Sequence, residues 1–242
     1  MGKKILLGIV AVVVLAAAAA AWLVMTKGDQ FVANAIETYG RAATGTNVAV
    51  RGVELALTQG RGDVKGLTIG NPPGYSSEYF LQIDNITLVL DLGSLRGRVP
   101  IVKELLVDTA HLNAEQHGQA TNLTDLEHRI SSPSPAAKPV PPQNEGRIII
   151  ERFRLTHGRI TLTSDVLKHP EDIELADVAV DGIGRSSGGV TYEQAAEAML
   201  APILQATRSA VEARLRKAAE DAARDKAEGA LSEQLKKSLE RN

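Results

Sequence analysis

The five histidines are the first residues of this chain to consider as chemical groups, because the sequence contains no cysteine. They lie at positions 111, 117, 128, 157 and 169. No two of them have the i,i+3 or i,i+4 spacing that places a pair of metal ligands on one face of a helix. We therefore expect no metal site, and the lack of cysteine also excludes disulfide bonds and thiol catalysis.

Acidic residues gather around Pro170, where Asp165, Glu171 and Asp172 lie close in sequence to His169. A catalytic centre would also need a nucleophile and donors for an oxyanion, and this stretch supplies neither. The chain also lacks the motifs of serine hydrolases, P-loop proteins, zinc proteases and dinucleotide-binding enzymes. We expect solvated turn residues here, and neither enzyme activity nor a cofactor.

The composition argues against nucleic acid as a partner. Aromatic residues make up 3% of the 242 residues, and the formal net charge is −2. The chain therefore offers few aromatic platforms for base stacking and no basic field for phosphates. Its core must be built mainly from alanine, valine, isoleucine and leucine.

Residues 1–27 have the pattern of a cytoplasmic tip followed by a transmembrane anchor. Ile5–Met25 is a run of 21 residues without a charge. At about 1.5 Å per residue, such a helix crosses about 30 Å of hydrocarbon. Trp22, near the far end of the run, suits the aromatic position at a membrane interface.

The flanking charges predict the orientation of this anchor. Two lysines precede the run, whereas Lys27 follows it alone and is soon followed by Asp29. The excess of positive charge places the N-terminus in the cytoplasm and the rest of the chain across the membrane. A cleaved signal peptide is the alternative, with Ala16–Ala21 as the cleavage region, but the apolar run is longer than a signal segment. The residues assigned to the membrane interface are Lys3, Lys4, Trp22 and Lys27.

After the anchor, the pattern predicts a short helix and then a β-sheet. Asp29 is a candidate N-cap for a helix that extends to Thr44. Three runs rich in isoleucine, leucine and valine follow between Leu81 and Glu115, separated by turn residues. Their near-alternation of apolar and polar residues predicts antiparallel strands with one buried face.

The alternation changes phase inside three of the predicted strands. Within residues 47–57 the apolar positions move from even to odd numbers at Gly52, and similar shifts occur within residues 81–92 and 173–180. A β-bulge produces such a shift and bends a strand, so one hypothesis is a strongly curved sheet with a concave apolar face. Misplaced strand boundaries are the alternative.

A short internal repeat relates two segments that lie 48 residues apart. Residues 101–115 align without gaps with residues 149–163, and each segment has a small residue, Ala110 or Gly158, in its middle. We interpret each segment as a β-hairpin that turns at this residue, used twice in one sheet. Between them, residues 131–146 contain five prolines and predict an extended linker, or a proline-rich ligand for a partner domain.

The last segment opens at Thr191 or Tyr192 and predicts a long amphipathic helix, with Pro202 and Gly229 as candidate interruptions. Such a helix could pack on the sheet, pair with a second copy, or lie on a membrane surface. Its alanine-rich stripe and mixed charges argue against the membrane surface. The stripe consists of Leu200, Leu204, Thr207, Val211, Leu215, Ala218 and Ala222, and resumes at Leu231, Leu235 and Leu239.

The whole pattern predicts an α+β fold with a transmembrane helix, a curved antiparallel β-sheet shaped as a groove or taco, and a long C-terminal helix. We divide the chain into the anchor (1–27), a helix plus sheet (28–130), the proline-rich linker (131–146), a second β-hairpin unit that continues the sheet (147–190) and the charged helix (191–242).

Several short motifs in residues 30–125 carry a family resemblance, which extends loosely to residues 147–181. They are GLTIGNPPGY at 66–75, the pattern ID.I.L.LDL.SL at 83–95, the pattern I...L.VD...L..E at 101–115 and TNL at 121–123. Together with the anchor and the short helix, these motifs resemble the N-terminal region of AsmA-like proteins of Gram-negative bacteria, which belong to a superfamily of bridge-like lipid transporters.

This resemblance implies an inner-membrane protein with a periplasmic, elongated sheet folded into an apolar groove, and a role in phospholipid traffic and envelope integrity. The chain departs from larger relatives in its length. Eight or so strands at about 4.8 Å spacing make a sheet of about 40 Å, which is too short to bridge a periplasm alone. The chain also ends in a charged helix where larger relatives continue with more sheet.

Two classes of function follow from this reading. In the first, the groove binds or passes phospholipid in outer-membrane maintenance. In the second, the chain is a non-transporting envelope scaffold that recruits other proteins, or its own copy, through a sheet edge or the C-terminal helix. The candidate residues for a lipid groove are Leu55, Leu57, Leu67, Ile69, Leu88, Leu90, Val107, Ile160 and Leu162.

Overall fold

The computed structural model describes most of the chain between residues 29 and 228. The described residues are 29–118, 120–131, 146–164, 167, 169–192, 194–199, 201–203, 205–207, 209–210, 213–214, 216–217, 220, 224 and 228. None of the helices in these residues is long and apolar enough to span a bilayer. The predicted anchor and its interface residues Lys3, Lys4, Trp22 and Lys27 lie outside the described residues.

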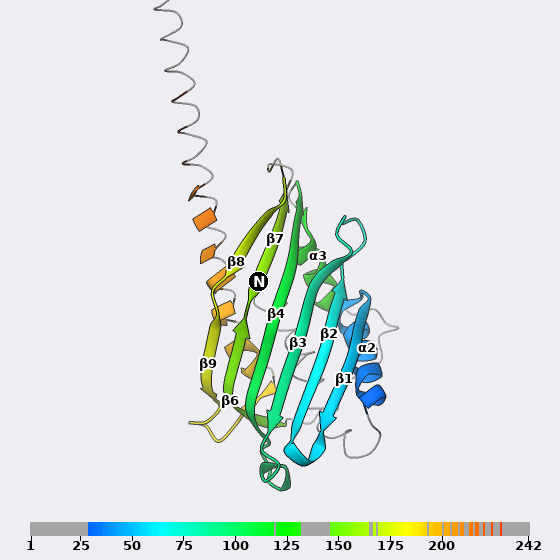
Figure 1. Ribbon diagram of the computed structural model, residues 1–242, viewed down its shortest axis with the longest axis vertical. Coiled ribbons are helices and arrows are strands. Elements are labelled where there is room, and N and C mark those ends of the chain that lie inside the picture. Colours follow the sequence, from blue (N-terminus) through cyan, green and yellow to red (C-terminus); the bar gives the residue numbers. More distant parts are fainter. Residues whose placement is uncertain are drawn as a thin grey trace, which may run out of the picture.

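Ten strands form one sheet, accompanied by helices (Figure 1). Every described residue from 192 to 228 is helical, and we call this element the C-terminal helix. Two short 3-10 turns, η1 (Leu57–Gln59) and η2 (Ser94–Arg96), lie in loops. The other elements are α2 (Asp29–Thr44), β1 (Val48–Ala56), β2 (Arg61–Gly70), β3 (Tyr79–Leu90), β4 (Ile101–His117), β5 (Ala120–Thr121), α3 (Asn122–Ser131), β6 (Arg147–Thr156), β7 (Gly158–Ser164), β8 (Glu171–Leu175), β9 (Val178–Ile183) and β10 (Val190–Thr191).

These elements confirm the α+β class, the large and mostly antiparallel sheet, and the C-terminal helix. The bounds of α2 also match the prediction, and the C-terminal helix continues through Pro202 without a break at that residue. The helix α3 was not predicted.

The sheet is open and uncurled, so the predicted groove or taco shape is not what the described residues form. Among them, the edge strand β1 pairs only with β2, and at the other edge β8 pairs only with β7 and β9 only with β6. The physical reason is that helices cover the apolar face. A sheet that is already covered does not need to fold on itself to bury that face.

The internal repeat is a pair of parallel neighbouring strands, which corrects our interpretation of two hairpins. Ile101 pairs with Ile149 and Asp108 with Thr156, and the same offset of 48 residues continues where β7 pairs with β4. The chain does not reverse in the middle of either copy. It continues through a kink, because Thr109 and His157 both have positive φ, 55° and 53°.

The three phase shifts of the sequence lie on one row across the sheet. The strand register is unchanged on both sides of this row in β1–β2, in β2–β3 and in β3–β4, so the shifts within residues 47–57 and 81–92 are not β-bulges. The third shift marks a strand boundary, because β8 ends at Leu175 and β9 begins at Val178. Neighbouring strands change phase at the same level, which keeps their hydrogen bonds aligned while side chains on both sides of the row still reach the core. By register, the row consists of Arg51, Gly66, Asp84, Thr109, His157 and Ala176.

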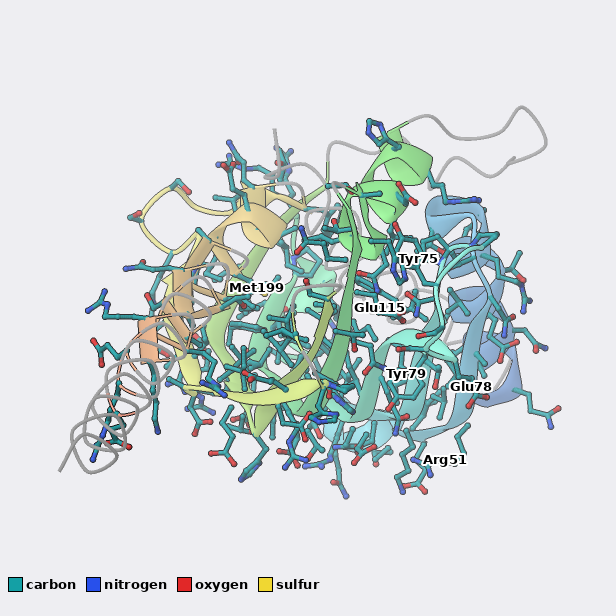
Figure 2. The ribbon with its side chains drawn as sticks, turned by 90° about the horizontal axis from the view of Figure 1, so that it is seen from above. Arg51, Tyr75, Glu78, Tyr79, Glu115 and Met199 are labelled. Carbon is teal, nitrogen blue, oxygen red and sulfur yellow. The ribbon has the colours of Figure 1, made fainter. Side chains whose placement is uncertain are left out.

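The core lies between one face of the sheet and the helices. Figure 1 shows the strands in front and α2, α3 and the C-terminal helix behind them, and Figure 2 shows the same arrangement from above. Val32 and Ile36 of α2, Leu126 of α3 and Ala195 and Met199 of the C-terminal helix belong to the same buried cluster as the strand residues.

The opposite face of the sheet is polar and carries ion pairs between neighbouring strands. Glu54 pairs with Lys65, and Arg154 pairs with Asp181 at 2.8 Å between Nη1 and Oδ1. This face is therefore solvated, and the apolar face beneath the helices supplies the core.

Candidate functional site

A buried carboxylate holds the loop between β2 and β3. Glu115, near the end of β4, is 2% exposed. Its carboxylate accepts hydrogen bonds from the backbone N–H groups of Ser76 at 2.8 Å and Ser77 at 2.7 Å, and from the Ser76 hydroxyl at 2.7 Å. Figure 2 shows Glu115 beside Tyr75 of the same loop. This charged side chain therefore fixes the backbone between β2 and β3.

Burial alone would raise the pKa of Glu115, but the hydrogen bonds from Ser77 and Ser76 outweigh burial and lower the pKa to about 2. The carboxylate stays ionised at neutral pH, and all its close partners are donors. Such a group neither accepts nor gives a proton near pH 7. Its chemistry is structural.

Three asparagines complete this polar cluster. Asn122 begins α3, and its side-chain Nδ2 donates to Asn71 Oδ1 at 2.9 Å and to the Asn113 carbonyl at 2.7 Å, while its Oδ1 accepts from the Glu115 backbone N–H. Asn71 also donates to the Ser77 carbonyl at 2.8 Å. We name Asn71, Asn113, Glu115 and Asn122, with residues 72–77, the loop clamp. It joins β2, β3, β4 and α3, and it brings together residues of the motifs NPPGY, LNAE and TNL.

Tyr75 connects the loop clamp to α3. Its hydroxyl donates to Asp125 Oδ2 at 2.8 Å, and its ring stacks on His117 with 5.7 Å between the ring centroids. Burial, followed by the hydrogen bond to Asp125, raises the pKa of Tyr75 to about 12, so the phenol stays protonated. Among the described residues, no buried side-chain polar atom lacks a hydrogen-bond partner.

A second polar chain crosses four strands through His111. The Tyr79 hydroxyl lies 3.1 Å from His111 Nδ1, His111 Nε2 lies 2.7 Å from Thr161 Oγ1, and Thr161 donates to Asp172 at 2.6 Å. A neutral imidazole with its proton on Nε2 satisfies every member. Because the Thr161 hydroxyl donates its hydrogen bond to Asp172, it is not arranged as a nucleophile activated by His111.

The remaining histidines have separate surroundings. His157 lies 2.7 Å from Asp108 through Nδ1, and this contact, chiefly its hydrogen bond, raises the pKa of His157 and lowers the pKa of Asp108. His128 and His169 are exposed. Within the described residues, no group of three or more His, Asp or Glu side chains could hold a metal ion.

The acidic stretch around Pro170 is not one cluster. Glu171 pairs with Arg214, Asp172 accepts from Thr161, and Asp165 lies outside the described residues. The two carboxylates at the start of β8 are therefore engaged by different partners, one from the C-terminal helix and one from β7.

The residues predicted for a lipid groove have very different environments. Leu67, Ile69, Val107 and Ile160 are buried in the protein interior, with exposures of 3%, 2%, 8% and 1%. Leu57 is instead 48% exposed, in η1. The half-buried residues of the set are Leu55, Leu88, Leu90 and Leu162. The structure does not bring the nine residues together on one free surface.

The C-terminal helix has two parts with different roles. Ala195, Ala196 and Met199 are fully buried, and Ile203 packs against the core. Further on, Arg214 donates to both oxygens of Glu171 at 2.7 Å, at the start of β8. The described residues after this ion pair are all exposed, namely Arg216, Lys217, Glu220, Arg224 and Glu228.

Sequence reasoning missed the loop clamp because it searched for catalytic and lipid-lining residues. The available signal was an isolated glutamate near the end of a long strand, and only the folded chain brings it to the turn residues 76 and 77. No protein-family model matches the chain, and the curated proteins provide no match either.

Proposed function

We propose that this chain is an AsmA-like, membrane-anchored periplasmic protein of the bacterial envelope that acts as a scaffold rather than as a lipid carrier. In this proposal the sheet is a platform whose apolar face is covered by helices, and the outer part of the C-terminal helix recruits a protein partner. In this proposal the chain catalyses no reaction, and the buried side-chain polar atoms of the described residues, all of which are hydrogen-bonded, serve the fold.

One element carries the proposal. The C-terminal helix fills the apolar face of the sheet with Ala195 and Met199, both 0% exposed, and then continues past the Arg214–Glu171 ion pair with exposed residues. Lipid tails need an apolar surface without an occupant, and a recruited protein needs a surface that projects. The C-terminal helix occupies the apolar surface that lipid tails would need, and its outer part is the projecting surface that a protein partner could bind.

The sheet edge is a weaker candidate for recruitment than the helix. At the β1 edge, Glu37 of α2 accepts from the Val50 backbone N–H at 2.9 Å, and Arg41 donates to the Val48 carbonyl at 3.3 Å. These side chains satisfy backbone groups that an added strand would need. Lipid binding is the second proposal, because Leu88 and Leu90 are half-buried and part of their surface reaches solvent.

Site-specific photo-crosslinking in membranes tests both proposals with the full chain. A photoreactive amino acid at Glu220 should form protein adducts, whereas the same group at Leu88 should form no phospholipid adduct. A position inside the predicted anchor, Val14, serves as the positive control for lipid, and the exposed Glu197 at the start of the helix is the matched control for Glu220.

The outcomes separate the two functions. A phospholipid adduct at Leu88 as abundant as that at Val14 would replace the scaffold with a lipid carrier. Equal adducts at Glu197 and Glu220, or none at either, would contradict recruitment by the outer part of the helix.

A further inference from the structure

The two large hydrophobic side chains that the described residues expose lie at one end of the sheet. Leu57 is 48% exposed and Leu92 is 42% exposed. Leu57 begins the turn between β1 and β2, and Leu92 belongs to the loop between β3 and β4. The two loops touch, because the Leu90 N–H at the end of β3 donates to the Gly60 carbonyl at 2.8 Å and a Cβ at Gly60 would lie 3.1 Å from Leu92 Cδ2.

This end of the sheet also presents two exposed arginines. Arg96 and Arg98 follow Leu92 in the same loop, and neither forms an ion pair with another described residue. Asp91, the acidic residue of the loop, is paired with Lys103 at 3.7 Å. The loop therefore offers leucine next to unpaired positive charge, which is the combination that binds an anionic membrane interface.

The direction of α2 places the start of the described chain near the same end. Glu37 contacts Val50 and the later residue Arg41 contacts the earlier residue Val48, so α2 runs antiparallel to β1. Its first residue, Asp29, is consequently nearest to the β1–β2 turn along the sheet, and Figure 1 shows the start of α2 toward the lower end of the sheet, where the β1–β2 and β3–β4 loops lie.

The distances allow these loops to reach the surface of a bilayer. From Glu37, Asp29 lies about 12 Å along the helix, and from Val50, Leu57 lies about 23 Å along the strand, which leaves a difference of about 11 Å. The predicted anchor ends at Met25, and the residues between it and Asp29 span at most about 14 Å. Leu57 and Leu92 can therefore reach the level at which the anchor leaves the membrane.

We propose that Leu57, Leu92, Arg96 and Arg98, which we name the basal end, rest on the membrane that holds the anchor. The leucines enter the interfacial region, and the arginines bind the phosphates of anionic headgroups. The strands then stand away from the bilayer, and the C-terminal helix leaves the opposite end of the sheet, where Glu171 binds Arg214. This inference rests on the anchor of the proposed function.

Depth-dependent fluorescence quenching tests the basal end, and the absence of cysteine makes each label unique. The full chain with Leu92→Cys is labelled and reconstituted into vesicles of phosphatidylcholine and phosphatidylglycerol, with or without brominated acyl chains. Brominated lipid should quench the label several-fold more than the same label at Glu78→Cys, an exposed position at the opposite end of the sheet. A label at Thr26→Cys reports the anchor itself.

Charge reversal identifies the role of the arginines. Arg96→Glu with Arg98→Glu should reduce the quenching at Leu92→Cys several-fold in these vesicles, whereas Arg51→Glu, an exposed arginine of β1, should leave it unchanged. Circular dichroism and the Tm check that each variant is folded.

The possible failures are distinguishable. A quenched Thr26 label with equal signals at Leu92 and Glu78 overturns the basal end and leaves the anchored scaffold standing. An unquenched Thr26 label removes the anchor and overturns both. Quenching at Leu92 that charge reversal does not change overturns the binding of anionic headgroups by the arginines.

Discussion

At the scale of single residues, Glu115 shows how a charge can be buried at a benefit to the fold. Its carboxylate accepts three hydrogen bonds from residues 76 and 77, and these bonds compensate for the loss of water. Glu115→Gln replaces one acceptor oxygen with an NH2 group that faces N–H donors. We expect the free energy of unfolding in urea to fall by about 2–3 kcal/mol. Glu78→Gln, at an exposed position of the same loop region, is the control and should change it little.

The same carboxylate predicts a pH dependence. The pKa of Glu115 is about 2 in the folded protein against an ordinary value of 4.5. A carboxylate whose pKa is depressed by folding stabilises the protein at pH values above its ordinary pKa. That contribution is lost as the pH falls from about 5 toward 2. It amounts to about 3 kcal/mol. The free energy of unfolding should therefore fall less with decreasing pH for Glu115→Gln than for the wild type. An equal fall for both proteins would contradict the low pKa.

Gly66 is the β2 residue of the row at which the neighbouring strands change phase. It has a φ of 62°, and a Cβ added there would lie 2.7 Å from Arg51 Nε. Gly66→Ala should therefore cost about 2 kcal/mol of unfolding free energy, from the left-handed conformation and from the displaced arginine. Gly52→Ala in the neighbouring strand meets nothing within 4 Å and should be nearly neutral. Similar losses for the two variants would show that the backbone at Gly66 is not constrained.

At the scale of elements, the first turns of the C-terminal helix replace what a groove would leave open. Met199 is 0% exposed within the core cluster. Met199→Ala should destabilise the protein by about 2–5 kcal/mol, because it removes buried methylene groups and leaves a cavity. Glu197→Ala, exposed on the same helix, should have a small effect. Thermal unfolding that shifts equally for both would mean that the helix does not pack on the sheet in solution.

At the scale of the whole molecule, the sheet and the helices that cover it share one buried core, and the described residues of the helix beyond Arg214 lie outside that core. A stop codon after Lys217 removes only residues beyond the Arg214–Glu171 ion pair, so the Tm should remain within a few degrees of the wild type. A stop codon after Tyr192 also removes Ala195 and Met199 and should abolish cooperative unfolding. If the longer truncation folded as well as the shorter one, the apolar face would not need the helix as a cover.

The molecule as a whole also has a polarity along its strands. The loop clamp and the Arg214–Glu171 ion pair occupy one end of the sheet, and Leu57 and Leu92 occupy the other. A membrane at the basal end and a protein partner at the outer helix would use both ends without competing. This division of surfaces is consistent with a scaffold that holds something at a distance from the bilayer.

The sequence by itself determined the elements whose signals are local. Asp29–Thr44 has a helix start and helical spacing, and the strands have apolar alternation, so α2, the sheet and the C-terminal helix followed from short-range patterns. The three phase shifts and the repeat at 48 residues were also present in the sequence. Their structural cause could not be read from the sequence. A phase shift in one strand has the same sequence pattern whether it comes from a β-bulge or from a row along which neighbouring strands change phase together.

Only the tertiary structure decided how these elements combine. The parallel pairing of β4 with β6 and β7 joins segments separated by α3 and the proline-rich linker, and no local pattern distinguishes it from two hairpins. The loop clamp brings Asn71 to Glu115 and Asn122 across more than forty residues. An apolar pattern predicts that a face of the sheet is buried, but it does not identify the element that covers this face. In this protein α2, α3 and the C-terminal helix cover that face, so the face is part of the core where we had predicted a groove.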